Sequence, residues 1–386
     1  MRNFVSRQLA QIKPSAIRRF FDIINTMEDA ISLGVGEPDF VTPQNIRQAA
    51  VDSLHQGRTR YSSNAGAIEL RELLAAKLNE LYGLEYDPNG EIVVTVGASE
   101  AVGGAMTAVL DPGDEVIIPQ PCFVSYVPEV LFNHGVPVLV NTYYENNFAV
   151  TAADIEAKVT PKTKAIFLSY PNNPTGAVVP REEMLKIAQV AIKHDLLIIS
   201  DEIYDRLVYG VKHVCVAALP GMRERTLHIS GFSKAYAMTG WRIGFIAGPK
   251  EIMGAVAKVH QYGIMCASTM SQYAAIEALR NGESAVQEMV AEYDRRRQMI
   301  VKGFNSMGLP TFEPKGAFYC FPKISSLGMS ANEFTEKLLL EEKVAVVPGD
   351  AFGECGKEHV RACYATSMEQ IEEALTRISR FVESHV

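Results

Sequence analysis

Cysteine is scarce in this chain of 386 residues, which has six scattered cysteines and no C-x-x-C pair. The spacing therefore indicates neither a zinc site nor a disulfide framework. No stretch approaches 18 uninterrupted apolar residues, so no transmembrane helix is predicted. Residues 1–8 also lack the apolar core of a signal peptide. These absences lead us to expect a soluble protein in the reducing cytoplasm.

Positive charge is not in excess either. Lysine and arginine total 37 against 45 aspartates and glutamates, which gives a net charge of −8. A nucleic-acid partner would favour a basic face, so we expect neither a nucleic-acid nor a membrane partner. The apolar fraction of 47% is that of an ordinary globular protein. The length is sufficient for two domains and a large core.

Short apolar runs alternate with longer amphipathic segments, such as 99–110 and 182–194, through the middle of the chain. Strands that are apolar on both faces and alternate with helices are typical of a mostly parallel sheet covered on both sides. The predicted strands are 91–96, 115–118, 136–140, 165–168, 196–200, 226–229 and 243–247. We therefore expect an α/β fold whose large domain holds a mostly parallel seven-stranded sheet covered by helices.

The last third of the chain changes character. A long polar helix is predicted over 284–307, and short strands and charged helices follow it, which indicates a smaller α+β domain. We expect the N-terminal segment to pack with this domain. The predicted divisions are an N-terminal segment (1–44), a large cofactor-binding domain (45–285) and a small C-terminal domain (286–386).

The sequence Ser-Gly-Phe-Ser-Lys at 230–234 places a lysine just after the strand 226–229, and Arg242 follows eight residues later. A lysine in this setting can form a Schiff base. A nearby hydroxyl and the guanidinium suit a phosphate. An imine-forming lysine beside a phosphate site indicates pyridoxal phosphate, which carries both an aldehyde and a phosphate. The alternative is that Lys234 lies on the solvated surface, as most lysines do.

Other polar residues follow predicted strands, and ligands bind at the carboxyl ends of strands in parallel α/β sheets. Asp201 directly follows 196–200. It could cap a turn, or it could hold the proton of a cationic pyridine nitrogen. Tyr204 could donate to the phenolic oxygen of such a cofactor, or it could simply pack. Asn173 lies in a turn with two prolines, which would present a rigid amide.

Three further segments have two interpretations each. The first-turn amides of Ala98 and Ser99 could bind an anion where a helix begins, although no glycine-rich nucleotide motif follows that strand. Ser99 could instead be only an N-cap. Phe123 could stack on an aromatic ring or belong to the core. Arg361 could clamp a carboxylate with two hydrogen bonds or lie at a sheet edge.

Together these segments resemble the class I/II pyridoxal-phosphate aminotransferases, which have the aspartate aminotransferase fold (fold type I). The resemblance covers essentially the whole chain and is nearest to the branch with aspartate, aromatic and N-acetyl-diaminopimelate aminotransferases. The matching segments are Gly36-Glu37-Pro38-Asp39-Phe40, Tyr61 with Asn64-Ala65-Gly66, Gly97-Ala98-Ser99-Glu100, Pro171 to Gly176, Asp201-Glu202-Ile203-Tyr204, Ser230 to Lys234, Gly240-Trp241-Arg242-Ile243-Gly244 and Arg361.

The resemblance implies a role at the cofactor for several residues. Lys234 would form the Schiff base and then carry the proton that moves between the substrate and the cofactor. Asp201 would pair with the ring nitrogen. Asn173 and Tyr204 would hold the phenolate oxygen, and Phe123 would stack on the ring.

The resemblance also implies how the phosphate is held. Arg242, Ser233 and the backbone amides of Ala98 and Ser99 would contact it within one chain. Tyr61 would reach the phosphate of the neighbouring subunit, which makes a homodimer the expected working unit.

Arg361 would bind the substrate α-carboxylate, aided by Asn173 and the backbone of Gly36.

In one respect the chain differs from many relatives, which place a hydroxyl three residues before the lysine. Here that position is Gly231. We expect Ser233, rather than Ser230, to contact the phosphate.

The implied reaction is a ping-pong transfer of an amino group from an amino acid to a 2-oxo acid such as 2-oxoglutarate. The donor would be aspartate, an aromatic amino acid or N-acetyl-diaminopimelate. One alternative is a pyridoxal-phosphate β-lyase acting on cysteine-type substrates. The other is a non-enzymatic pyridoxal-phosphate sensor fused to a DNA-binding module. We do not expect the sensor, because the chain has no room for an extra basic domain ahead of residue 31. We expect Ile17, Phe20, Phe21 and residues 262–268 to shape substrate selection.

Overall fold

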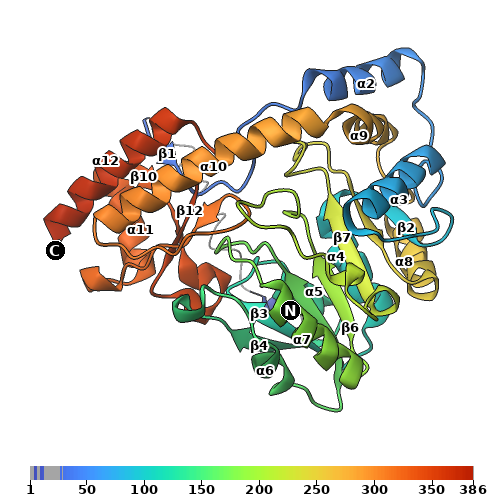
Figure 1. The fold of residues 1–386 in the computed structure, drawn as a ribbon, viewed down its shortest axis with the longest axis horizontal. Coiled ribbons are helices and arrows are strands. Elements are labelled where there is room, and N and C mark those ends of the chain that lie inside the picture. The colour runs from blue at the N-terminus through green and yellow to red at the C-terminus, as the bar shows by residue number, and fades with distance from the viewer. Residues whose placement is uncertain (1–3, 7–8, 13–26, 28, 386) are drawn as a thin grey trace.

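A seven-stranded sheet forms the centre of the larger part of the molecule (Figure 1). The computed structural model describes residues 4–6, 9–12, 27 and 29–385. The strand order is β2-β8-β7-β6-β5-β3-β4, and only β8 runs antiparallel to its neighbours. The strands are β2 (Ile92–Thr95), β3 (Glu115–Gln120), β4 (Val136–Asn141), β5 (Thr163–Ser169), β6 (Leu197–Asp201), β7 (Thr226–Gly231) and β8 (Gly244–Ala247). The predicted α/β fold with a mostly parallel sheet is confirmed.

Helices cover both faces of this sheet because its strands are apolar on both sides. Ile117, Ile166 and Ile198 belong to one core, which also includes α6 and α7. Their chain neighbours, such as Phe167 and Ile199, belong to a second core on the other side, which includes α4, α5 and α8. This alternation is the two-residue period of a strand.

The helices of this part are α2 (Gln44–His55), α3 (Ile68–Tyr82), α4 (Gly97–Val109), α5 (Tyr126–Phe132), α6 (Ala152–Glu156), α7 (Arg181–Lys193), α8 (Lys250–Gly263) and α9 (Thr269–Asn281). Short 3-10 helices are η1 (Leu9–Gln11), η2 (Tyr144–Asn146), η3 (Val216–Ala218), η4 (Arg223–Arg225), η5 (Ser325–Leu327), η6 (Gly349–Phe352) and η7 (Glu354–Gly356). Among the described residues, no helix is both long enough and apolar enough to cross a bilayer.

The C-terminal part is a smaller α+β unit that the N-terminal segment joins (Figure 1). Strand β1 pairs in parallel with β10, and β11, β12 and β9 form a second, antiparallel sheet. The predicted boundary between residues 285 and 286 falls inside helix α10. The predicted domain limits remain a proposal. The elements are β1 (Ile31–Ser32), α10 (Glu283–Ser306), β9 (Tyr319–Cys320), α11 (Ala331–Glu342), β10 (Val344–Ala345), β11 (Val347–Pro348), β12 (Val360–Cys363) and α12 (Met368–His385).

His359, which lies just before β12, is buried in a cluster of aromatic rings. Its ring stacks on Phe321 with centroids 5.0 Å apart and meets the edge of Phe148 at 5.3 Å. Neither ring nitrogen has a hydrogen-bond partner in the described part of the chain. Burial therefore lowers the pKa of His359 to about 4, because a charged imidazole would be poorly solvated there.

The low pKa of His359 leads us to expect that acid lowers the stability of the fold. An unfolded histidine takes up its proton near pH 6.5, but the folded chain resists protonation down to the His359 pKa of about 4. The unfolded state thus binds more protons in this window, and stability falls as pH drops from 6.5 to 4, by about 3 kcal/mol in full. We expect His359→Phe to lose less Tm between pH 7 and pH 5 than wild type, whereas the exposed control His55→Phe should behave as wild type. Equal acid-induced losses in all three proteins would contradict this interpretation.

Candidate active site

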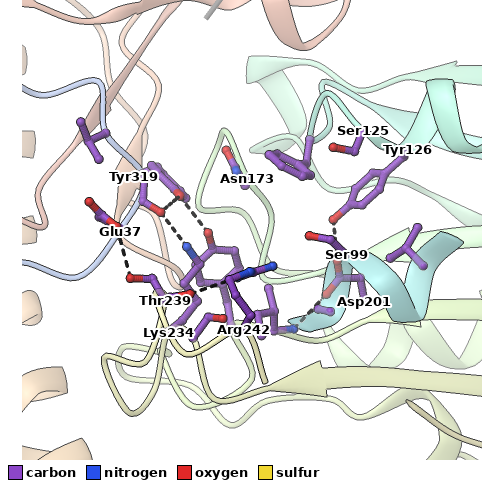
Figure 2. Close-up of a pocket in the computed structure, with 18 of the residues that line it drawn as sticks. Glu37, Ser99, Ser125, Tyr126, Asn173, Asp201, Lys234, Thr239, Arg242 and Tyr319 are labelled. Carbon is purple, nitrogen blue, oxygen red and sulfur yellow. Dashed lines mark hydrogen bonds between the residues drawn. The ribbon is translucent and has the colours of Figure 1, made fainter. Parts of the chain in front are cut away.

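A cavity of about 430 Å³ lies where β5, β6 and β7 end (Figure 2). Figure 2 shows Asp201 and Tyr126 on one side of the view, Glu37 and Tyr319 on the other, and Lys234 between them. The predicted site residues that line it are Gly36, Ala98, Ser99, Phe123, Asn173, Asp201, Tyr204, Ser233, Lys234, Arg242 and Arg361. Residues distant in the sequence are thus brought to one cavity.

Two predicted groups lie elsewhere. Tyr61 is not part of the cavity wall, and its side chain is 81% exposed on the surface of this chain. Ile17, Phe20 and Phe21 lie outside the described residues. Residues 262–268 are described, and they form the exposed end of α8 and the loop that leads to α9.

Lys234 follows the end of β7 and is partly buried. Its Nζ donates a hydrogen bond of 2.6 Å to the carbonyl oxygen of Gly36 and lies 5.9 Å and 5.6 Å from the ring centroids of Tyr204 and Phe318. Burial lowers the pKa of Lys234 to about 8. At this pKa, about a tenth of the amine is neutral at pH 7, and the neutral amine is the nucleophilic form.

Asp201 is the last residue of β6, and its carboxylate is buried. One oxygen accepts a bond of 3.2 Å from the amide of Ile203, and the other accepts a bond of 2.9 Å from the Tyr126 hydroxyl. Burial raises the pKa of Asp201 to about 6, although both hydrogen bonds oppose this shift. No lysine or arginine of the described chain pairs with this carboxylate. It is therefore suited to a cationic group brought by a ligand.

Arg361 on β12 is only 3% exposed and has only neutral acceptors. Its Nη1 donates to Asn173 Oδ1 at 2.9 Å, and its Nη2 donates to the carbonyl of Gly34 at 2.5 Å. Its Nε, also buried, has no partner within the described residues. Buried charges are normally paired, so this guanidinium is suited to a carboxylate from a ligand.

Arg242 lies against the first turn of α4. Gly97 opens this helix with φ +75°, and a Cβ there would come within 2.5 Å of Nη2 of Arg242. The residue before it, Val96, places no side-chain cap on the helix. The uncapped first-turn amides and the guanidinium lie together and are suited to binding an anion.

The two serines near Lys234 differ in position. Ser233 lines the cavity, whereas the Ser230 hydroxyl donates to the carbonyl of Glu202 at 3.3 Å. Packing explains why position 231 is a glycine, because a Cβ there would lie 2.9 Å from the Cα of Gly244 on the neighbouring strand. The close approach of β7 and β8 therefore leaves no room for a hydroxyl at position 231.

The comparisons with known proteins decide the family. Residues 28–378 match the family described as aminotransferase class I and II. The chain belongs to this family. It is therefore an aminotransferase, and the predicted resemblance and enzyme class are confirmed.

Named relatives match this aminotransferase over nearly their full length. An aspartate aminotransferase of Pyrococcus abyssi is 49% identical over 97% of each chain. An aromatic-amino-acid aminotransferase of Thermococcus litoralis is 46% identical over 98% of each chain. The crystal structure of an aromatic aminotransferase from Pyrococcus horikoshii has a TM-score of 0.91 at 45% identity, covering 96% of this chain and 99% of that one.

Two tyrosines that line the cavity, Tyr126 and Tyr319, were not predicted from the sequence. Tyr126 begins α5 and donates to Asp201, yet it follows no predicted strand. The Tyr319 hydroxyl lies 2.8 Å from that of Tyr204, and its ring packs 4.6 Å from the Arg361 guanidinium carbon. Tyr319 could not be assigned to the site from the sequence, because its alignment with Tyr204 depends on how the C-terminal part packs.

The contact between Gly97 and Arg242 predicts the effect of one methyl group. We expect Gly97→Ala to displace the guanidinium, lower aminotransferase activity and destabilise the fold by about 1 kcal/mol or more, because φ is also positive there. In the control Gly104→Ala, on the same helix, the nearest atom would lie 4.0 Å away, so activity should be kept and stability held or improved. Thermal unfolding and steady-state rates check both. Similar activity and stability of the two variants would contradict the claim that Arg242 needs a glycine at position 97.

Proposed function

We propose that this aminotransferase uses pyridoxal 5'-phosphate, held through Lys234, to move an amino group from an amino acid to a 2-oxo acid by a ping-pong mechanism. The observation that carries the proposal is the set of unmatched charges around Lys234. Asp201 lacks a cation, and Arg361 and Arg242 lack carboxylate partners among the described residues. A ligand with a basic ring nitrogen and a phosphate, followed by an amino acid carboxylate, supplies each missing charge.

The proposed cofactor fits the donor set. The uncapped start of α4, Arg242 and the Ser233 hydroxyl offer donors for a phosphate. Asp201 offers an acceptor for a protonated ring nitrogen, and Tyr204 and Asn173 offer groups for a phenolic oxygen. Phe123 lines the same cavity and offers a face for stacking.

Each residue then has a chemical task. Bound pyridoxal 5'-phosphate supplies an aldehyde carbon that bonds to amines and a ring that takes up an electron pair. Asp201 keeps the ring nitrogen protonated, which lets the ring take up those electrons. Arg361 holds the substrate carboxylate and so fixes the direction of the Cα–H bond. The Lys234 amine, once free, takes the proton from Cα, which its pKa of about 8 allows.

We propose a homodimer in which Tyr61 of the partner subunit completes the phosphate site. Tyr61, Tyr262 and Met265 are 81%, 88% and 47% exposed, so large side chains are left uncovered on the loop before α3 and on the end of α8 with the loop after it. The Asn64 side chain joins the two segments by a hydrogen bond of 2.7 Å to the carbonyl of Met265. Exposed patches of this kind mark interfaces.

The amino donor is the open part of the proposal. Relatives are named for aspartate and for aromatic amino acids. We propose aspartate, an aromatic amino acid or N-acetyl-diaminopimelate as donor, with 2-oxoglutarate as acceptor. Relative kcat/KM values for these donors identify the substrate, because specificity is a ratio of such values.

Replacing Lys234 tests the proposed cofactor attachment. The purified enzyme should show the visible absorbance of an imine, which borohydride removes. We expect Lys234→Ala to lose this absorbance and nearly all turnover, because both the covalent link and the proton carrier are gone. The exposed control Lys158→Ala should keep both. A wild-type protein that stays colourless after incubation with pyridoxal 5'-phosphate would refute the proposal.

Changes at Asp201 test how the ring nitrogen is used. We expect Asp201→Ala to keep partial cofactor binding and lose most turnover, because the ring would no longer be held protonated. Tyr126→Phe should raise the pKa of Asp201 by removing a hydrogen bond to the carboxylate, so the acid limb of the rate–pH profile should move to higher pH. Tyr209→Phe, which removes another buried hydroxyl, is the control. Wild-type turnover in Asp201→Ala contradicts the assigned role.

A further inference from the structure

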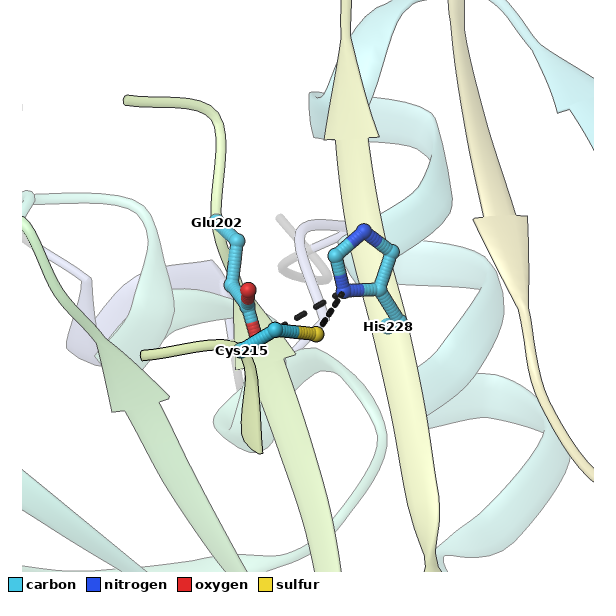
Figure 3. A group of neighbouring side chains, drawn as sticks. All are labelled: Glu202, Cys215 and His228. Carbon is cyan, nitrogen blue, oxygen red and sulfur yellow. Dashed lines mark hydrogen bonds and ion pairs between the residues drawn. The ribbon is translucent and has the colours of Figure 1, made fainter. Parts of the chain in front are cut away.

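Three buried side chains from separate segments meet outside the active-site cavity (Figure 3). Glu202 follows β6, Cys215 precedes η3 and His228 lies on β7, and they are 0%, 3% and 0% exposed. Cys215 Sγ lies 3.7 Å from His228 Nδ1, and this nitrogen lies 3.5 Å from Glu202 Oε1. No C-x-x-C pattern signals this group, since each member comes from a different segment.

The spacing of these three atoms suits one metal ion. All three lie within 4.8 Å of one another. A point equidistant from three atoms with such separations lies roughly 2.1–2.4 Å from each, which matches the lengths of zinc bonds to oxygen, nitrogen and sulfur. The side chains thus need little movement to coordinate an ion.

The Glu202 carboxylate is held from several sides, as metal-binding carboxylates usually are. Its Oε1 accepts bonds of 2.8 Å from the Ser200 hydroxyl and 3.1 Å from the amide of Val216. Its Oε2 lies 2.5 Å from Nε2 of His213. The carboxylate is therefore oriented before any ion arrives.

The chemistry of the three groups selects the metal. A thiolate and an imidazole favour zinc over magnesium or calcium, which prefer oxygen ligands. One thiolate and one carboxylate also balance the two charges of the ion, so no net charge is left buried. Only the cluster offers partners to the His228 ring, because its Nε2 has none among the described residues.

We propose that Glu202, Cys215 and His228 bind one zinc ion per chain. On binding, the Zn–S bond forms, the S–H bond of Cys215 breaks and its proton passes to water. The ion joins the end of β6, the start of η3 and β7. His228 lacks a second hydrogen bond on its ring, so the site should bind more weakly than a four-ligand structural site and should release zinc to a strong chelator.

Cobalt uptake by the purified, cofactor-loaded enzyme tests this site. The enzyme is treated with a chelator, dialysed, and titrated with Co²⁺ as a spectroscopic substitute for zinc. We expect one cobalt per chain, the visible bands of a Co²⁺ site with a thiolate ligand, and loss of these bands when zinc is added. Zinc should also raise Tm, because it binds only the folded chain.

Variants identify the ligands. Cys215→Ser and His228→Asn should lose the cobalt bands and the zinc-dependent rise in Tm, whereas Cys320→Ser, which changes another buried thiol, should keep both. The proposal is overturned if wild type binds no stoichiometric cobalt, or if Cys215→Ser gives the same bands. If these variants do not fold, the wild-type stoichiometry and Tm shift still decide. The cofactor absorbance is read separately, so failure here leaves the proposed aminotransferase chemistry untouched.

Discussion

Asp201 lies opposite Ser169 of β5 and Ile229 of β7 in the parallel register of the sheet. This register brings three strand ends to one level, and the chain leaving them carries Asn173 and Lys234 into the same cavity. A slip of one residue in β6 would turn Asp201 to the other face and exchange the apolar side chains of the two cores. The packing that stabilises the sheet therefore also positions the site.

Several charged groups of the cavity have no partner of opposite charge among the residues that the structure describes. Burial pushes the pKa of Asp201 up to about 6 and that of Lys234 down to about 8, so both groups are biased toward their neutral forms. Arg361 is held by neutral acceptors. Such groups cost stability, and a ligand that supplies their counter-charges recovers it. We infer that this mismatch underlies both binding and reactivity.

The local hydrophobic pattern of the sequence was enough to predict the strands of the main sheet and the site residues that follow them. Asp201 could be found because it directly follows an apolar run, and Lys234 because it comes five residues after one. All seven strands of the main sheet had such runs. Tyr126 and Tyr319 were missed because their contacts join segments far apart in the chain. The cluster at Glu202 was missed for the same reason, since only the alignment of β6, β7 and the turn before η3 brings its members together. The glycine at position 231 is explained only by the approach of Gly244 on the neighbouring strand.

A half-reaction tests most directly whether Lys234 and its surroundings carry the amino group between two substrates. The purified enzyme is mixed with an excess of the best amino donor and no acceptor, and the released 2-oxo acid is counted. We expect one 2-oxo acid per active site, loss of the imine absorbance, and its return when 2-oxoglutarate is added. Release of oxo acid and ammonia continuing without acceptor, or no release until both substrates are present, would contradict the ping-pong transfer.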